Sequence, residues 1–162
     1  MPLNATAAAQ LVDLLGEACT RSATTTSSQR LPQGTGPLML TTIATVLAGL
    51  LGAALIFMGG NAFMRPQAAV GFGIPDTPAD DPAFQHWLRV KGLREIAFGV
   101  SIFVLMLVAT TSVLGWYVMV LAAIPAGDAV VVLRSGGPKA TAYGVHVATA
   151  VVMLATGIGL LV

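Results

Sequence analysis

The sequence predicts an all-α fold, a four-transmembrane-helix bundle with a flexible N-terminal tail. Hydrophobic residues make up 56% of the 162 residues and charged residues only 9%, whereas about 25% is usual in a soluble domain. So few charged side chains cannot cover the surface of a soluble protein of this size, which excludes a soluble globular enzyme. The net charge is only +1. Proteins that bind nucleic acids need a strongly basic surface, so no nucleic-acid partner is expected.

Residues 31–64, 96–127 and 140–162 carry no charge, and these runs indicate membrane helices because about 20 apolar residues span a bilayer. We expect helices over residues 38–64, 82–110, 113–134 and 140–162. Asp81 and Pro82 have the residue types typical of an N-cap and a first helical position. The run Ser135-Gly136-Gly137-Pro138 separates the last two helices.

Two segments are predicted to lie outside these helices. In the N-terminal region, residues 1–37, apolar residues at helical spacing over 5–19 indicate a short amphipathic helix, and a Ser/Thr-rich flexible tail follows. Asn4 begins an Asn-Ala-Thr glycosylation sequon. In the link between the first two helices, Phe72 and Ile74 are expected to fold back over the mouth of the bundle.

Basic residues predict the orientation of the bundle. They gather at the ends joined by the first–second and third–fourth links, as Arg65, Arg89, Lys91, Arg94, Arg134 and Lys139. The opposite side has only Arg21 and Arg30. By the positive-inside rule the first side is cytoplasmic and both termini are lumenal or exterior. We therefore expect a multi-pass integral membrane protein of the endoplasmic reticulum or the plasma membrane.

Polar side chains within the apolar helices indicate where function resides, because they are costly in a membrane. At about 1.5 Å per residue, Asn61, Asp128 and His146 lie roughly 6–10 Å inside their helix ends. Arg94 and Glu95 reach a similar depth on the second helix. Since the inner faces of a four-helix bundle meet, these side chains are expected to share one polar pocket.

Within that pocket we expect specific roles for the polar residues. The predicted catalytic residues are Asp128 and His146 as acid and base, Arg94 as an anion or carbonyl clamp, and Glu95. The predicted substrate-binding residues are Asn61, Tyr143, Thr149 and Lys91. An i,i+4 pair between Lys91 and Glu95 would leave Arg94 free to turn inward. We expect Arg94, Asp128 and His146 to face one interior space, with its mouth near residues 65–81.

The same residues also admit a purely structural interpretation. An Arg94–Asp128 ion pair could fix the helix register within a closed polar network. Pro125 frees the carbonyl of Leu121 and Gly127 permits a bend, which suits either a cavity-lining broken helix or a simple kink. The residue set favours neither a metal site nor a cofactor.

Four motifs, FGIP, KGLREIAFG, IPAGDAVVVLRSGG and GVHVATAVVM, resemble those of an uncharacterised family of small four-helix membrane proteins found in fungi and bacteria. The resemblance covers about residues 38–162. Its pattern falls on Phe72-Gly73-Ile74-Pro75, Lys91, Arg94, Asp128 and His146. Fungal members are similar in size and topology to small membrane proteins of secondary-metabolite pathways, including cyclases and cofactor-free oxygenases. The resemblance implies no particular activity, since fold does not determine function.

Three functions remain open from the sequence. The first is a membrane enzyme of cyclase or isomerase type that acts on a lipophilic small molecule by acid–base chemistry. The second is a proton-coupled carrier, because intramembrane Asp and His also occur in carriers. The third is a non-catalytic accessory protein that recruits soluble pathway enzymes. The expected partners are the lipid bilayer, a lipophilic substrate, and either a second copy of the chain or pathway enzymes.

Overall fold

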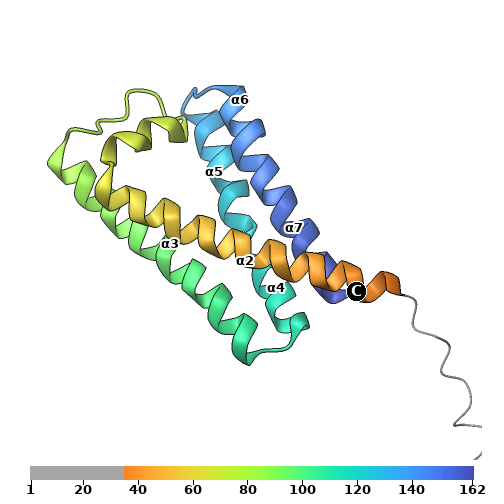
Figure 1. The fold of residues 1–162 in the computed structure, drawn as a ribbon. Coiled ribbons are helices and arrows are strands. Elements are labelled where there is room, and N and C mark those ends of the chain that lie inside the picture. The colour runs from red at the N-terminus through yellow and green to blue at the C-terminus, as the bar shows by residue number, and fades with distance from the viewer. Residues whose placement is uncertain (1–34) are drawn as a thin grey trace, which may run out of the picture. The chain divides into compact units, whose positions relative to one another are not determined.

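The computed structural model describes residues 35–162, and this part of the chain is all-α (Figure 1). The elements are α2 (Thr35–Met64), the 3-10 helix η1 (Pro66–Phe72), α3 (Pro82–Val108), α4 (Thr111–Leu121), α5 (Ala123–Arg134), α6 (Lys139–Thr141), the π-helix η2 (Ala142–Val147) and α7 (Ala148–Leu161). The predicted helix over 5–19, the Asn4 sequon and the tail as far as residue 34 lie outside the described residues.

The observed helices begin and end close to the predicted boundaries. Asp81 is the N-cap of α3, and its carboxylate accepts a hydrogen bond from the Phe84 amide at 2.9 Å. Thr110 caps α4 in the same way, with its hydroxyl 3.4 Å from the Val113 amide. The predicted third helix is divided into α4 and α5 at Ala122. This division lies one turn before Pro125, which cannot donate to the carbonyl of Leu121.

Three helical stretches are long and apolar enough to cross a membrane: Leu38–Met64, Thr111–Arg134 and Lys139–Leu161. These spans make the chain a multi-pass membrane protein. The fourth predicted span, α3, does not meet the same criterion although it has 27 residues. Its N-terminal half carries Arg89, Lys91, Arg94 and Glu95, which lower its hydropathy. The predicted four-helix count is therefore not established by helix length and composition.

Glycines bring α2 and α3 into direct backbone contact. A Cβ atom on Gly99 would lie 2.5 Å from the carbonyl oxygen of Gly52, and one on Gly92 would lie 2.7 Å from that of Gly59. Each pair is separated from the next by seven residues on both helices, which is two helical turns. The two helices thus pack along an antiparallel seam where backbone meets backbone, a contact that small residues permit.

The apolar core lies away from the charged end of the bundle. Ala44 and Ala48 of α2, Ile102 of α3 and Val118 of α4 are buried in one cluster, together with Leu114, Leu121, Ala122, Met153 and Leu160. Gly115 of α4 also meets the Gly157 carbonyl oxygen of α7, 2.9 Å from a Cβ built on Gly115. Small residues therefore close the bundle at the end where α4 begins and α7 finishes.

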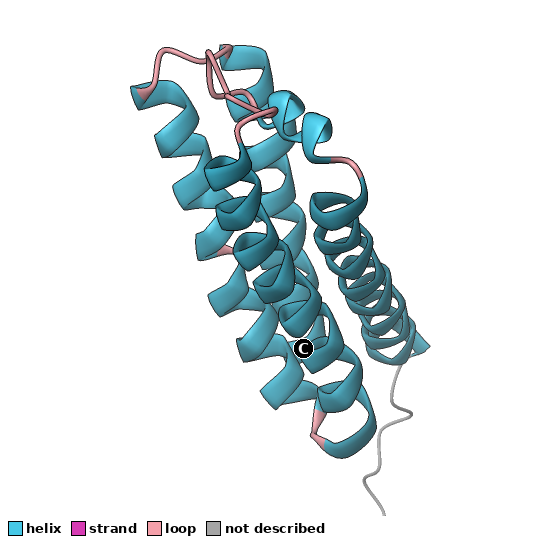
Figure 2. Ribbon diagram, turned by 90° about the vertical axis from the view of Figure 1, so that its left-hand side faces the viewer, coloured by secondary structure: helices cyan, strands magenta, loops and turns pink. Residues whose placement is uncertain are grey.

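The opposite end is capped by the segment between α2 and α3. Gly73 ends η1 with a φ of 96°, in the left-handed region that favours glycine. A Cβ there would lie 2.8 Å from Cγ2 of Thr141, so the segment packs directly on α6. Figure 2 shows the long helices side by side with their links at the two ends.

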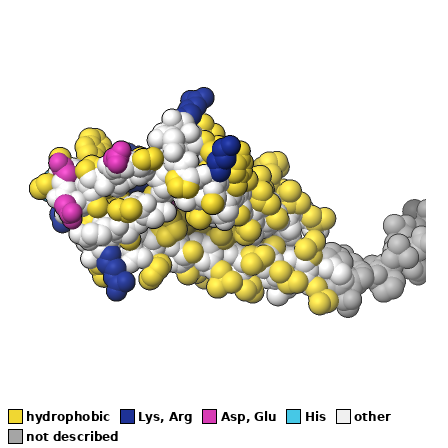
Figure 3. Space-filling view, turned by 90° about the horizontal axis from the view of Figure 1, so that it is seen from above, with side chains coloured by type: hydrophobic (Ala, Val, Ile, Leu, Met, Phe, Trp, Pro, Cys, Tyr) yellow, Lys and Arg dark blue, Asp and Glu magenta, His cyan; other side chains and the backbone are white. Residues whose placement is uncertain are grey.

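All charged side chains of the described residues lie between Arg65 and Lys139. None occurs in residues 35–64, 96–127 or 140–162. Figure 3 shows the consequence on one face of the molecule, where Lys, Arg, Asp and Glu gather at one end and apolar side chains cover the body. A bundle embedded in a membrane typically has charged side chains at the ends of its helices and apolar side chains on the surface that faces the lipid.

Candidate functional site

A cavity of about 640 Å³ lies at the charged end of the bundle. Its walls come from the second half of α2, the first half of α3, η1 with the link after it, α5, and η2 with the start of α7. Most lining side chains are apolar, including Leu55, Phe98 and Ile124. Ligand cavities commonly have volumes of about 300–1,000 Å³ with a few polar groups among apolar walls, so this one has the size and composition for a small molecule.

His146 is fixed at the cavity from two sides. It is only 7% exposed, and its Nε2 lies 2.9 Å from the carbonyl oxygen of Phe72. Because a carbonyl oxygen only accepts, Nε2 carries the hydrogen and donates it. The Phe72 and His146 rings also lie against each other, with centroids 4.6 Å apart at 57°. In the neutral imidazole the second nitrogen, Nδ1, is then left as an acceptor.

The backbone around His146 departs from a regular α-helix. Ala142–Val147 forms the π-helix η2, in which one extra residue is inserted into the turn. Such insertions rotate the following side chains and are frequent at functional sites. Here η2 packs on α5, so it places His146 on the side of the helix that faces Asp128.

Lys91 and Glu95 of α3 form the predicted ion pair, with Nζ 2.7 Å from Oε1. The Glu95 side chain is 8% exposed, whereas that of Lys91 is 39% exposed. Lys91 Nζ also lies 5.4 Å from the centroid of the Phe72 ring. The ammonium group is therefore held between a carboxylate and an aromatic face, and both side chains line the cavity.

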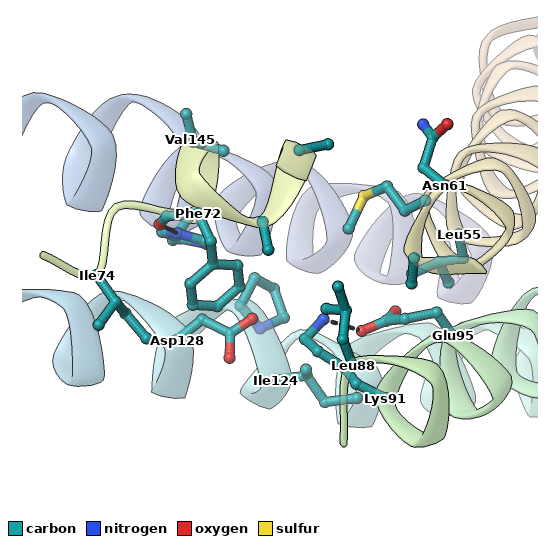
Figure 4. Close-up of a pocket in the computed structure, with 18 of the residues that line it drawn as sticks. Leu55, Asn61, Phe72, Ile74, Leu88, Lys91, Glu95, Ile124, Asp128 and Val145 are labelled. Carbon is teal, nitrogen blue, oxygen red and sulfur yellow. Dashed lines mark hydrogen bonds and ion pairs between the residues drawn. The ribbon is translucent and has the colours of Figure 1, made fainter. Parts of the chain in front are cut away.

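Asp128 of α5 projects into the cavity. Figure 4 shows its carboxylate beside the Phe72 ring, with the Lys91–Glu95 pair across from it. Lys91, Glu95 and His146 line the same cavity and are near enough to Asp128 to interact with it electrostatically. We call these four side chains the polar cluster. Within residues 35–162, Asp128 makes no hydrogen bond or ion pair, in contrast to the other three.

Asn61 and Thr149 line the cavity from opposite sides, on α2 and α7. The amide of Asn61 points away from the Lys91–Glu95 pair in Figure 4. The hydroxyl of Thr149 donates to the Val145 carbonyl at 2.7 Å, within its own helix. Both residues thus border the space without joining the polar cluster.

Two predicted site residues lie elsewhere. Arg94 is exposed and does not line the cavity, so the prediction that it turns inward beside Asp128 and His146 is wrong. An Arg94–Asp128 ion pair is likewise not formed. Tyr143 is 57% exposed and also lies outside the lining. The positive charge inside the cluster comes from Lys91, which was expected to bind substrate.

Phe72 has a larger part in the site than the sequence indicated. We expected it over the mouth, and it does line the cavity, but its carbonyl also orients His146 and its ring contacts both His146 and Lys91. A backbone acceptor leaves no signal in a sequence. The only available signal was the FGIP motif, whose glycine gives the turn that presents Phe72.

The cluster contains groups for proton transfer: a carboxylate that has no partner among residues 35–162 and an imidazole with one oriented nitrogen. Among the described residues, no three His, Cys, Asp or Glu side chains come together as a group that could hold a metal ion. The arrangement can bind the polar end of a ligand at Asp128 and His146 while its apolar body occupies the rest of the cavity.

The comparisons with known proteins identify a family and no function. No curated protein and no solved structure matches the chain significantly. A family model described as a domain of unknown function, DUF4267, matches residues 52–160. This range holds the whole polar cluster and nearly all of the cavity lining. The predicted resemblance to an uncharacterised family is confirmed, and the chain belongs to the DUF4267 family.

Proposed function

We propose that the protein is a four-span membrane enzyme that isomerises or cyclises a lipophilic small molecule by proton transfer, with Asp128 and His146 as the acid–base pair. The observation that carries this proposal is the cavity of about 640 Å³ with apolar walls. It holds an oriented imidazole and a carboxylate that the described part of the chain leaves unpaired. A dry, shaped space with two proton-transfer groups is what such reactions require.

The position of α3 supports a fourth span. Gly73 packs on Thr141, so the link before α3 and the link between α5 and α6 lie at the same end of the bundle. The link from α3 to α4 lies at the other end, because α4 and α5 lead from it back to α6. With 27 residues, α3 is about 40 Å long at 1.5 Å per residue. It packs along α2 from Gly92 through Gly99 to Met106, which lies beside Gly49.

The chemistry follows from the two groups. His146 Nδ1 takes a proton from one carbon of the substrate as its double bond shifts, and the Asp128 carboxyl returns a proton to another carbon. No electrons are exchanged, and a proton passing from His146 back to Asp128 restores the starting state. Lys91, held by Glu95 at 2.7 Å, can stabilise negative charge that develops on a substrate oxygen.

The basic residues gather at the end of the bundle that holds the cavity, and by the positive-inside rule this end faces the cytoplasm. Arg65, Arg89, Arg134 and Lys139 all lie there. The membrane would be that of the endoplasmic reticulum or the plasma membrane, and secondary-metabolite biosynthesis is the setting that the family resemblance favours.

The test compares metabolites of cells that express the wild type, Asp128→Asn, His146→Ala or Arg94→Gln at equal membrane abundance. We expect a product feature in untargeted mass spectrometry that the first two variants lose by at least about 100-fold, since acid–base groups contribute about 10²–10⁴-fold. Arg94→Gln should keep the product, because Arg94 lies outside the cavity.

Undiminished product in both Asp128→Asn and His146→Ala would exclude the proposed acid–base pair. Accumulation of an unchanged compound in proteoliposomes would identify a proton-coupled carrier instead. Function that survives both cavity variants but is lost when residues 65–81 are replaced by a Gly/Ser linker would identify an accessory protein that recruits pathway enzymes.

A further inference from the structure

The charges of the cavity do not balance, and the imbalance lies at Asp128. Of the residues that the structure describes, two basic and three acidic side chains line the cavity: Arg65, Lys91, Asp76, Glu95 and Asp128. Arg65 and Asp76 are exposed and of opposite sign. Lys91 and Glu95 form an ion pair at 2.7 Å. With His146 neutral, one negative charge is left, on a carboxylate within a membrane-spanning helix.

The single N–H of neutral His146 and the positive charge of Lys91 already have partners in the protein. His146 Nε2 donates to the Phe72 carbonyl at 2.9 Å. Lys91 Nζ is held by Glu95 and lies 5.4 Å from the Phe72 ring centroid. Asp128 therefore faces the cavity without a counter-charge from the described part of the chain. A carboxylate in this position is costly unless something pairs with it.

We propose that the ligand of this cavity is a lipophilic amine whose ammonium group pairs with Asp128. This inference rests on the proposed function, because it names the substrate class of the same site. The apolar body of the amine would lie against the walls formed by residues such as Leu55, Phe98 and Ile124. The Phe72 ring beside Asp128 offers the ammonium group an aromatic face as well.

The pairing is compatible with proton transfer at Asp128. When the ammonium proton passes from nitrogen to the carboxylate oxygen, a neutral amine and a protonated Asp128 result. Asp128 is then in the carboxyl form that the proposed reaction requires, and the proton held by His146 at the end of the reaction returns to the amine. The number of protons on ligand and protein together is unchanged.

Three probes that share one apolar cage but differ in their polar group show how much of the binding depends on charge and how much on shape. They are 1-aminoadamantane, 1-adamantanol and adamantane-1-carboxylic acid, in radiolabelled form. Binding is measured by equilibrium dialysis against the full chain in nanodiscs of zwitterionic lipid, with empty nanodiscs as the blank. We expect the wild type to bind the amine at least about tenfold more tightly than the alcohol, and the acid least tightly.

The variants assign this selectivity to Asp128. Asp128→Asn removes the charge with little change of shape and should reduce amine binding to that of the alcohol, while binding of the alcohol stays the same. The matched control is Asp80→Asn, which removes an exposed acid from the same end of the bundle but outside the cavity. It should leave all three affinities unchanged.

Each outcome decides the inference. Equal binding of amine and alcohol by the wild type, or undiminished amine binding by Asp128→Asn, would overturn the amine proposal and leave the cavity as a site for a neutral lipophile. If Asp128→Asn also fails to bind the alcohol, the variant is uninformative, and the relative affinities of the wild type for the amine, the alcohol and the acid decide whether the amine proposal holds. Binding of none of the probes would contradict the ligand cavity itself, and the proposed function with it.

Discussion

At the scale of single residues, a comparison of two glycines with positive φ distinguishes the cost of backbone strain from the cost of crowding. Gly73 has a φ of 96° and Gly136 a φ of 76°, so alanine is strained at both. A Cβ at Gly73 would lie 2.8 Å from Thr141, whereas one at Gly136 would meet nothing within 4 Å. The left-handed conformation costs a non-glycine residue roughly 1–2 kcal/mol, and crowding at a packed contact costs about 1–3 kcal/mol more.

We therefore expect Gly73→Ala to lower the free energy of unfolding by more than Gly136→Ala does. Thermal unfolding of both variants in the same detergent measures the difference. Since Gly73 holds the segment that presents Phe72 to His146, Gly73→Ala should also weaken ligand binding, while Gly136→Ala should not. Equal losses of stability in the two variants would mean that the segment does not depend on its contact with Thr141.

Depth along a helix could be predicted from the sequence, but the direction of a side chain around the helix could not. Counting residues placed Asp128, His146 and Glu95 at one level, and the cavity contains all three. Arg94 has the same depth but lies about 100° around the helix from Glu95. Its direction is set by Gly92 and Gly99, which turn that side of α3 toward α2. This choice depends on a partner helix and is not visible in α3 alone.

At the scale of elements, the glycine seam between α2 and α3 leaves no room for a side chain at its contact points. Gly99→Ala would place a Cβ 2.5 Å from the Gly52 carbonyl oxygen, and backbone cannot move aside as a side chain can. We expect a loss of about 1–3 kcal/mol in unfolding free energy. The control is Gly127→Ala in α5, where a Cβ meets nothing within 4 Å and better helix propensity should stabilise by up to about 1 kcal/mol.

Chemical unfolding of both glycine variants, followed by the far-ultraviolet circular dichroism signal, measures the two effects. A Gly99→Ala protein as stable as the wild type would show that α2 and α3 are not in backbone contact.

The contact between α2 and α3 could be predicted only in part from the sequence. The glycines are visible in the sequence, yet which of them face a partner helix and which face open space depends on the packed pair.

The predicted boundaries of the long helices were close because charge and proline mark them. Asp81 with Pro82 and the Ser135–Pro138 run mark the starts of α3 and α6. Thr110, the N-cap of α4, lies inside the uncharged run 96–127 and is marked only by its residue type. The π-helix η2 and the 3-10 helix η1 could not be predicted in this way. Both depend on contacts between segments far apart in the chain, such as the hydrogen bond from His146 to Phe72.

At the scale of the whole molecule, the bundle is closed at one end and hollow at the other. Small residues such as Ala44, Ala48 and Gly159 let α2 and α7 approach closely at the closed end, with Gly159 in contact with Ala44. At the other end η1 and the link after it lie over a cavity whose polar groups come from α3, α5 and η2. Composition predicted the membrane class, but a cavity is a property of the assembled helices.

The path of α3 determines on which side of the membrane each link lies. If α3 crosses it, the link before α3 and the link between α5 and α6 share one side, and the link between α3 and α4 lies on the other. We expect cysteines at Asp80 and Lys139 to react with a membrane-impermeant maleimide from one side, and a cysteine at Ser112 from the opposite side. All three positions are exposed, and Cys19→Ser removes the native thiol from the background.

The measurement uses sealed vesicles of known orientation, with labelling before and after permeabilisation as the control for reactivity. The physical reason for the expected pattern is the contact of Gly73 with Thr141, which holds the first and third links together, and the length of α3, which carries the chain to the other end. Labelling of Asp80→Cys and Ser112→Cys from the same side would mean that α3 does not cross. The protein would then have three spans, and the charged half of α3 would lie at the membrane surface, with Lys91 and Glu95 outside the bilayer.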